Sequence, residues 1–590
     1  MGTLSARVIA ADVQSGRVTA RSVIEAALER VEAYDAVQPE TWISRPPREA
    51  VLAQADEVDR RVAAGEILPL AGVPFAVKDN LDVAGLNTSA ACPAFAYAPQ
   101  ESAAVIERLQ AAGAIVMGKT NLDQFATGLV GTRSPHGAPG CVFNRAYVSG
   151  GSSSGSAVAV AAGLVPFALG TDTAGSGRVP AAFNGLVGLK PTKGRWSTRG
   201  LVPACRSLDC VTVFAADVAD AALVDSVAAG FDPRDSYCRR EPESGSHIGQ
   251  SFRFGVPNPS QRQFFGDAES AALFEEAVRR LAAAGGNPVE VDIAPLLDAA
   301  KLLYSGPWVA ERTAAADRLL KSNPGAIHPV VRAILQGGVG VSGVDAFRGL
   351  YALQDFARAA EALWGVVDIL LLPTAPTIYR LSEVLAEPVA LNSNLGHYTN
   401  FVNLLDMSAV AVPAGWRANH TGFGVTLVGP AWADGALLAV AERYESAAPL
   451  PEAPPLDLGA RSETVRLAVV GAHLHGMPLH WQLTSRDARL AASTTTAPTY
   501  CLYAIADSVP PKPALVHVGA QGAAIAVEVY EMSTAAFGSF VAEVPPPLAI
   551  GSVTLTSGEV VKGFVAEPRA LDGAEDITHL GGWRAYIAGR

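Results

Sequence analysis

Apolar residues recur at helical spacing in some stretches of the chain and form short continuous runs in others. Several stretches alternate apolar and charged positions as amphipathic helices do, at residues 19–32, 48–64, 102–112, 268–284 and 344–364. Short apolar runs predict buried strands, at residues 69–77, 114–117, 252–256, 288–291 and 369–372. Because strands and helices alternate, we expect an α/β layer architecture.

The pattern changes at a proline-rich segment, where four prolines fall within residues 449–455. A chain of 590 residues exceeds the length of about 250–300 residues that one core supports. We therefore expect a domain over residues 1–446, a stiff linker over 447–464 and a smaller domain over 465–590. Short strands between Gly and Pro turns make this last domain α+β or β-rich, with candidates at residues 466–470, 500–504, 523–530 and 551–556.

Charge and cysteine usage narrow the class of protein. The formal net charge of -12 disfavours nucleic acid and anionic membrane as partners, because both bind to a basic face. The first residues lack the apolar core of a signal peptide, and no apolar run is long enough to cross a bilayer. The 6 cysteines are scattered without a CxxC pair, which is typical of reduced thiols. We expect a cytoplasmic protein without a cofactor.

Two motifs match familiar formulas without the structural context that their chemistry requires. Residues 113–120 fit the phosphate-binding formula GxxxxGK[ST], which needs a strand before the loop and a helix after it. Here a predicted helix precedes a strand, so we expect no nucleotide site. Residues 151–155 fit GxSxG, the nucleophile turn of α/β-hydrolases, and His247 or His328 follows in the required order. That second interpretation leaves Lys78 and the serine-containing segment after residue 170 unexplained.

Three histidines, His473, His475 and His480, lie close together in the predicted second domain. On a strand the first two share one face, whereas the third lies on the other. No cysteine or carboxylate cluster accompanies them. We therefore expect surface or core histidines and no metal site.

The most informative segment contains two clusters rich in glycine and serine, at residues 150–157 and 170–180. The apolar sequence VAVAAGLVPFALG separates them, which indicates a buried helix and strand with tight loops and not a flexible linker. Glycines in such loops allow backbone N–H groups to approach a ligand closely. The amides before Ser176 can therefore face one oxyanion, which makes Ser176 a candidate nucleophile. Asp172 and Arg178 bracket this loop and are expected to pair.

A serine nucleophile needs a base, and no histidine lies near either cluster. Lys78 ends the apolar run Val-Pro-Phe-Ala-Val, and burial can lower the pKa of a lysine by several units so that its amine accepts a proton. The competing interpretation is a lysine at a strand end whose amine reaches solvent. From the residues alone, Lys119 stays an alternative base, and Ser153 and Ser154 stay alternatives to Ser152.

Residues 150–180 resemble the signature of the amidase signature family, in which two motifs lie at a fixed separation. The resemblance extends through the predicted first domain, at residues 72–80, 188–194, 372–376 and 403–413. It implies a fold with a mixed central sheet covered by helices. It also implies a Ser–Ser–Lys triad, in which Ser176 attacks an amide carbonyl and Ser152, after a cis peptide bond, relays protons to Lys78.

The resemblance further implies which backbone amides stabilise the oxyanion: those of Thr173, Ala174, Gly175 and Ser176. Many family members have glycine where this chain has Ala174. A methyl group is compatible with the role because only the backbone N–H takes part.

Finer matches are similar to allophanate hydrolases, at residues 125–135, 207–214, 302–315 and 470–479. This resemblance implies that Arg312 grips the carboxylate of allophanate bidentately, with Tyr304 and Gly128 as further substrate contacts. The alternative for Arg312 is an arginine on the surface of an amphipathic helix.

The implied reaction hydrolyses allophanate to ammonia and N-carboxycarbamate through an acyl-enzyme. The second domain would then promote decarboxylation, with overall release of two ammonia and two carbon dioxide. Its general base would be His473, with His475 as the competing choice. A homodimer and a functional link to a separate urea carboxylase are also expected. The alternative is an amidase for another small amide, in which the second domain is only structural.

Overall fold

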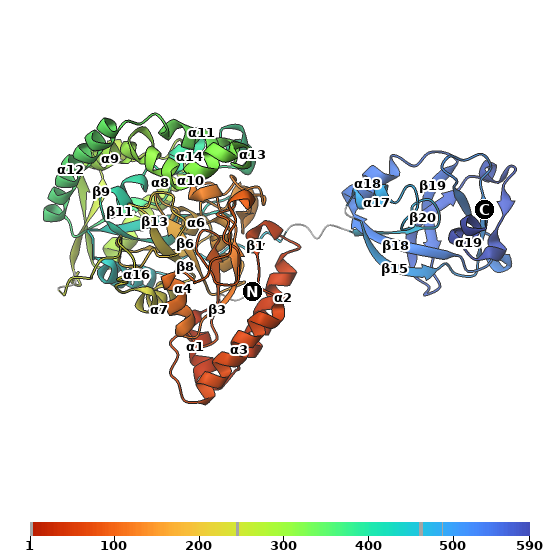
Figure 1. The fold of residues 1–590 in the computed structure, drawn as a ribbon, viewed down its shortest axis with the longest axis horizontal. Coiled ribbons are helices and arrows are strands. Elements are labelled where there is room, and N and C mark those ends of the chain that lie inside the picture. Colours follow the sequence, from red (N-terminus) through yellow and green to blue (C-terminus); the bar gives the residue numbers. More distant parts are fainter. Residues whose placement is uncertain (1–3, 244–246, 459–463, 487, 590) are drawn as a thin grey trace. The chain divides into compact units, whose positions relative to one another are not determined.

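The structure is a computed structural model that describes residues 4–243, 247–458, 464–486 and 488–589. The chain divides into two compact units, Met1–Asp457 and Leu458–Arg590. Each unit has its own hydrophobic core (Figure 1). The predicted linker borders at residues 447 and 464 stay a prediction, and residues 459–463 lie outside the described residues.

The first unit is built on one mixed sheet of 11 strands, which confirms the predicted α/β class. In order across the sheet these are β1 (Trp42–Ser44), β3 (Ile115–Thr120), β2 (Pro74–Lys78), β6 (Phe167–Asp172), β8 (Cys210–Ala215), β7 (Val187–Lys190), β12 (Ser408–Trp416), β13 (Gly422–Gly429), β11 (Ile369–Pro373), β9 (Phe252–Pro257) and β10 (Gly286–Val291). Strand β2 runs parallel to β3 and β6, so the carboxyl ends of these three strands meet at one edge. The strands between β6 and β11 pair antiparallel.

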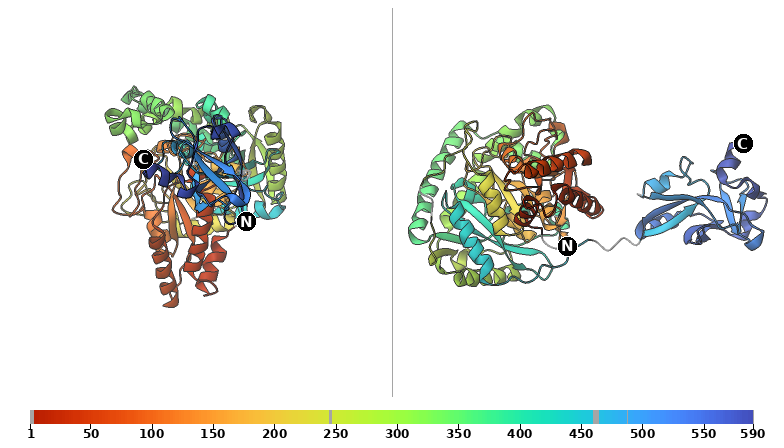
Figure 2. Two further views of the ribbon diagram at one scale, coloured as in Figure 1. Left: turned by 90° about the vertical axis from the view of Figure 1, so that its right-hand side faces the viewer. Right: turned by 90° about the horizontal axis from the view of Figure 1, so that it is seen from below.

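Helices surround this sheet (Figures 1 and 2). They are α1 (Ala6–Gln14), α2 (Ala20–Tyr34), α3 (Arg48–Ala63), α4 (Ala104–Ala111), α5 (Ser154–Ala161), α6 (Val179–Phe183), α7 (Val218–Ala228), α8 (Ala268–Ala283), α9 (Ala294–Ser305), α10 (Trp308–Ser322), α11 (Pro329–Gly338), α12 (Gly343–Val366), α13 (Leu381–Ala386), α14 (Ala390–Leu395), α15 (Asn400–Leu404) and α16 (Asp434–Ala447). Both faces of the sheet are buried, because Phe75 and Val77 of β2 join one core cluster and Ala76 joins another.

One predicted strand is longer than the observed one. The apolar run 69–77 predicts an extended segment throughout, but β2 begins only at Pro74. Gly72 has a φ of +67° and an added Cβ there would lie 2.8 Å from the Cβ of Ala20. The run therefore begins with a turn packed against α2, and only its second half joins the sheet.

The second unit combines a five-stranded and a three-stranded sheet, which agrees with the predicted β-rich domain. The larger sheet has the order β15 (Arg489–Thr495), β18 (Ala526–Ser533), β14 (Thr464–Val469), β20 (Val560–Ala566) and β19 (Leu548–Thr554). The smaller has the order β17 (Pro513–His517), β16 (Tyr500–Ala504) and β21 (Glu575–Asp576). Its described residues also form three short α-helices, α17 (Trp481–Thr484), α18 (Thr534–Val541) and α19 (Trp583–Ala588).

Hydrogen bonds join the proline-rich segment, residues 449–457, to the first unit. The indole Nε1 of Trp416 donates to the carbonyl of Pro451 over 3.2 Å. The amide of Asp457 donates to the carbonyl of Val142 over 2.8 Å. Residues 449–457 therefore belong physically to the first unit.

Within the described part of the chain, no single helix is long and apolar enough to cross a membrane. The bent pair α11 and α12 meets that test together by length and composition only.

Candidate active site

Lys78 lies at the carboxyl end of β2 and is completely buried. Its Nζ donates to Ser152 Oγ over 2.7 Å and to Thr171 Oγ1 over 2.8 Å. No carboxylate among the described residues lies within ion-pair distance of this amine. Burial lowers the pKa of Lys78 to about 7, although the carboxylates of Asp123, Asp209 and Asp172 oppose that shift. A substantial fraction of Lys78 is thus neutral near pH 7 and able to accept a proton.

Ser152 stands two residues before the start of helix α5, and its Oγ accepts from Lys78 at the end of β2. The Gly151–Ser152 peptide bond is cis, as the family resemblance implied. The carbonyl oxygen of Ser152 accepts a hydrogen bond from the amide of Asp123 over 3.0 Å. Ser153 and Ser154 contact other groups: Ser153 Oγ donates to the carbonyl of Thr171, and Ser154 Oγ to that of Asn121. Of these three serines, Ser152 is therefore the one that the described contacts join to Lys78.

Ser176 follows β6 in a tight loop that ends at α6. Its Oγ donates to the carbonyl of Gly128 over 3.5 Å, and the side chain is buried. The expected pair on either side of the loop is confirmed: Arg178 Nε and Nη2 each donate to Asp172 over 2.9 Å. Burial alone would raise the pKa of Asp172, but Arg178 holds it below its usual value. This buried ion pair fixes the loop that carries Ser176.

The same carboxylate also engages one of the predicted oxyanion amides. Gly175 N donates to Asp172 Oδ1 over 2.9 Å. Among the described residues, the amides of Thr173, Ala174 and Ser176 donate to no protein acceptor. The predicted oxyanion site is therefore narrowed to these three amides.

Arg312 is not a surface arginine of helix α10, because only 2% of it is exposed. Its Nη1 donates to Thr127 Oγ1 over 3.4 Å, and the guanidinium stacks 5.2 Å above the ring of Tyr304. Its buried Nε has no hydrogen-bond partner, and no carboxylate within the described residues pairs with it. A permanent cation with a free Nε–Nη2 edge matches a carboxylate ligand.

One segment links the Arg312 side chain to the Ser176 side chain. Thr127 accepts from Arg312, and the adjacent carbonyl of Gly128 accepts from Ser176. The structure thus brings together the predicted substrate residues Tyr304, Arg312 and Gly128 with the predicted nucleophile. Thr127 and Thr171 were missed as contact residues, although both lie inside segments that the resemblance covers.

The competing motifs do not form sites. Residues 115–120 form strand β3, and Lys119 is buried in an ion pair of 3.0 Å with Asp79. Its amine therefore serves a structural contact. His247 lies exposed in a loop, and His328 contacts Gln124 through its amide. Neither histidine has a described bond to a serine of the GxSxG segment.

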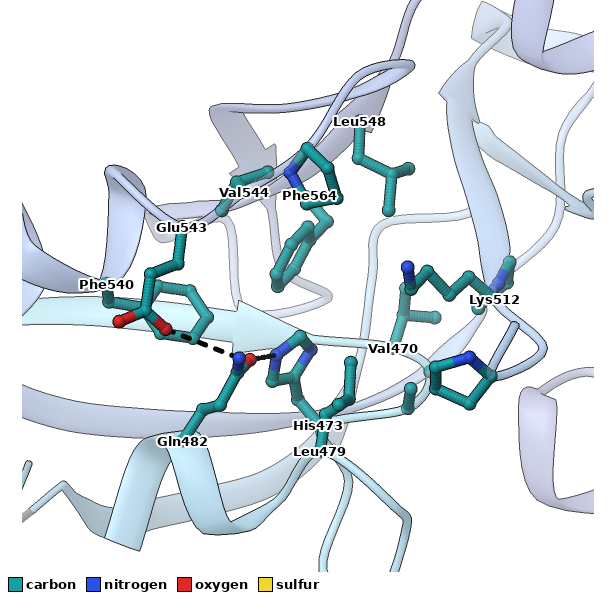
Figure 3. A pocket seen from close by; sticks show the side chains of 15 residues that line it. Val470, His473, Leu479, Gln482, Lys512, Phe540, Glu543, Val544, Leu548 and Phe564 are labelled. Carbon is teal, nitrogen blue, oxygen red and sulfur yellow. Dashed lines mark hydrogen bonds between the residues drawn. The ribbon is translucent and has the colours of Figure 1, made fainter. Parts of the chain in front are cut away.

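The second unit has a cavity of about 180 Å³ that His473, Gln482, Lys512 and Phe564 help to line (Figure 3). The His473 ring stacks on Phe564 with centroids 5.0 Å apart, and burial lowers its pKa. His473 Nε2 lies 2.8 Å from Gln482 Oε1, whose amide nitrogen donates to Glu543. Because that oxygen only accepts, Nε2 carries the proton and Nδ1 is free to accept one.

His475, the competing choice, belongs to a different group of contacts. Its amide donates to Glu528 over 2.7 Å, and its ring packs 4.9 Å from His480. His480 in turn contacts the hydroxyl of Tyr530 over 3.1 Å. The geometry favours His473 as the residue that faces a cavity.

Comparison with known proteins gives the class to which this fold and site belong. The amidase family matches residues 22–438, and the allophanate hydrolase C-terminal domain matches residues 465–588. The chain belongs to the amidase family and is an amidohydrolase. Its second unit carries the allophanate hydrolase C-terminal domain.

Particular relatives refine this placement. The allophanate hydrolase of Kluyveromyces lactis is 43% identical with a TM-score of 0.71, covering 98% of each chain. A structure of 6-aminohexanoate cyclic dimer hydrolase is 26% identical with a TM-score of 0.65, covering 76% of this chain and 97% of its own. The urea amidolyase of Saccharomyces cerevisiae is 45% identical over 92% of this chain, but the match covers only 31% of that longer protein. The chain thus spans about a third of the length of the curated urea amidolyases it matches.

Proposed function

We propose that this chain hydrolyses allophanate to ammonia and N-carboxycarbamate. The observation that carries the proposal is the buried Arg312, whose free guanidinium edge lies beside the segment that contacts Ser176. Allophanate places a carboxylate one nitrogen away from its amide carbonyl. A site with a cation fixed beside the nucleophile therefore suits allophanate better than it suits a neutral amide.

The chemistry proposed for the first unit begins with attack of Ser176 Oγ on the amide carbonyl carbon. Ser152 accepts the Ser176 proton and passes its own to neutral Lys78, with which it shares a bond of 2.7 Å. The tetrahedral oxyanion is held by the amides of Thr173, Ala174 and Ser176. Collapse breaks the C–N bond, and Lys78 returns the proton through Ser152 to the leaving ammonia.

The acyl-enzyme then carries a carbamoyl group that ends in the carboxylate held by Arg312. Water, deprotonated through the same Ser152–Lys78 relay, attacks the acyl carbon and releases Ser176 with N-carboxycarbamate. Loss of carbon dioxide from this product leaves carbamate, whose C–N bond then breaks to give ammonia and a second carbon dioxide. Allophanate, one water and one proton thus give two ammonia and two carbon dioxide overall.

We assign that decarboxylation to the cavity of the second unit. Lowering of the pKa of His473 by burial keeps its imidazole neutral near pH 7, so Nδ1 can act as a base. Lys512 lines the same cavity and offers a positive charge to an anionic intermediate. The match to the allophanate hydrolase C-terminal domain supports this assignment.

We also propose that a separate urea carboxylase supplies the allophanate. Urea amidolyases contain a region like this chain but are about three times as long, so the reaction that precedes this one would be carried out by another protein here. A homodimeric, cytoplasmic enzyme is proposed as well. Light scattering of the purified chain tests the oligomeric state, and a monomer at micromolar concentration would contradict it.

A substrate panel tests the reaction. Purified enzyme is given allophanate, acetamide and benzamide at equal concentrations, and ammonia is measured. We expect kcat/KM for allophanate to exceed that for the neutral amides by at least about 100-fold, the worth of a bidentate ion pair. Equal turnover of all three amides would refute the proposed substrate.

A further inference from the structure

The carboxyl group of Asp123 lies buried at the centre of the loop 123–133. Its Oδ2 accepts from the amides of Val130 over 3.2 Å and Gly131 over 3.0 Å. Its Oδ1 accepts from the amide of Arg133 over 2.9 Å. No cationic side chain of the described residues lies within ion-pair distance of it. The loop is thus closed around a buried carboxyl group that only backbone amides satisfy.

This loop carries both contacts that lead toward the proposed substrate site. Gly128 supplies the carbonyl that accepts from Ser176, and Thr127 supplies the hydroxyl that accepts from Arg312. A Cβ on Gly128 would lie only 2.4 Å from Asp123 Oδ2. A side chain at position 128 would therefore clash with this carboxyl group, and glycine allows the backbone to lie against it.

The same carboxyl group also touches the segment that carries Ser152. A Cβ on Gly151 would lie 2.2 Å from Asp123 Oδ2, so the backbone at Gly151 packs closely against the carboxyl group. In addition, the amide of Asp123 donates to the carbonyl of Ser152 over 3.0 Å. One residue therefore contacts both the segment that accepts from Ser176 and the segment that carries Ser152.

The charge of Asp123 acts on Lys78 as well. Burial lowers the pKa of Lys78, and Asp123 is foremost among the carboxylates that oppose the shift, before Asp209 and Asp172. Asp172 is already paired with Arg178, and burial raises the pKa of Asp209 to about 6. Asp123 pairs with no cationic side chain in the part of the chain that the structure describes. It is therefore the carboxylate whose removal changes the proton affinity of Lys78 most directly.

Other titratable groups near Asp123 do not duplicate this effect. Arg133 directs its Nη1 and Nη2 to the carbonyls of Thr127 and Pro388. The pKa of His328 is lowered by burial, so this ring is neutral at the pH of the reaction. The groups that face Lys78 itself are the hydroxyls of Ser152 and Thr171 and the carboxylates of Asp123, Asp209 and Asp172.

We propose that Asp123 is a positioning residue of the amidase reaction, which holds the Gly128 and Ser152 segments together and supplies the negative charge that keeps Lys78 a strong enough base. This inference rests on the proposed Ser176–Ser152–Lys78 reaction. It does not depend on which amide is the substrate, because the pH profile can be measured with any amide that the wild-type chain hydrolyses.

The experiment compares the pH profiles of kcat for wild type, Asp123→Asn and Asp225→Asn. Asp225 is a matched control because it is also buried but pairs with Arg195 and bonds Trp196. Activity requires neutral Lys78, so it rises with pH through the pKa of that amine. Loss of the Asp123 charge lowers this pKa, so we expect the acid limb to move to lower pH by about 1 unit. We also expect the plateau to fall by about tenfold or more, since a weaker base remains.

Asp225→Asn is expected to keep the wild-type midpoint. A folded Asp123→Asn variant with the wild-type midpoint would overturn the inference, even if its kcat were lower. If Asp123→Asn does not fold by circular dichroism, Asp123→Ser replaces it, because a hydroxyl can still accept one of the three amides.

Gly128→Ala separates positioning from charge, because it pushes against the same carboxyl group without removing it. We expect kcat to fall by about tenfold or more with the acid midpoint unchanged. A shifted midpoint in this variant would contradict the assignment of the pH effect to the Asp123 charge. Failure of wild type to hydrolyse allophanate would instead refute the proposed substrate and leave this comparison intact.

Discussion

Replacement of Arg312 by methionine should have opposite effects on activity and on stability. In the free protein only 2% of Arg312 is exposed, and within the described residues its guanidinium bonds only Thr127 and has no carboxylate partner. A buried cation without an ion-pair partner is costly because no opposite charge offsets its desolvation, and even buried ion pairs are often replaced by apolar residues of similar volume with a gain of about 1–4 kcal/mol. We therefore expect Arg312→Met to raise the free energy of unfolding by about 1–3 kcal/mol.

In the substrate complex the sign reverses. The carboxylate of allophanate would enter a buried site without its cation, a loss of about 3–5 kcal/mol. At about 1.4 kcal/mol per factor of ten, kcat/KM for allophanate should fall by at least about 100-fold. Arg312→Lys keeps the charge but loses the fork of two parallel donors, so a loss of about tenfold is expected. A neutral amide should be affected far less by either change.

The assay combines ammonia release with urea-induced unfolding for each variant. Arg318→Met is the matched control, because Arg318 lies on the same helix α10 but is not buried. This control should leave both quantities unchanged within about 0.5 kcal/mol. A loss of less than about tenfold for allophanate in Arg312→Met, or an equal loss for neutral amides, would refute Arg312 as the carboxylate site.

Three further predictions concern the remaining parts of the proposed reaction. Ser176→Ala should reduce ammonia release by about 10⁴-fold or more without changing the unfolding curve, and undiminished turnover would exclude Ser176 as nucleophile. For wild type, kcat should rise with pH along a titration curve whose midpoint lies near pH 7, because burial lowers the pKa of Lys78 to about 7 and only its neutral form accepts a proton. A midpoint near that of an ordinary lysine, about 10, would contradict this assignment. A chain ending at Asp457 should retain ammonia release while carbon dioxide release lags, and a folded but inactive truncation would contradict the division of labour between the two units.

The sequence pattern predicted those parts of the fold whose local signal is strong. Helix α2 follows Thr19, whose hydroxyl accepts from Ser22 N as an N-cap, and the amphipathic run 19–32 indicated it directly. Helix α8 and strand β11 were likewise predicted to within a residue at either end. In contrast, strands β8, β12 and β13 were not predicted. They are buried along nearly their whole length, so they lack the alternation that distinguishes a strand from other apolar segments.

The candidate site shows the same division. Ser176, Ser152 and Lys78 stand in compact motifs: the loop chemistry alone made Ser176 a candidate, and the resemblance to the family chose Ser152 and Lys78 over their neighbours. Asp123 has no comparable signal, because its importance comes from backbone amides at residues 130–133 that fold back onto it. The burial of Arg312 could not be predicted from the sequence either, since the pattern of an amphipathic helix does not reveal which of its polar residues faces inward.

The structure also gives a physical reason for choosing between two lysines that the residues alone left open. Lys78 and Lys119 are both fully buried on neighbouring parallel strands, and burial lowers the pKa of each. Lys119 lies 3.0 Å from a carboxylate oxygen of Asp79, which stabilises its charged form. Among the described residues, Lys78 contacts two hydroxyl groups at 2.7 and 2.8 Å, which can accept from an ammonium or donate to a free amine. Of the two, Lys78 can therefore lose and regain a proton at little cost, as a base must.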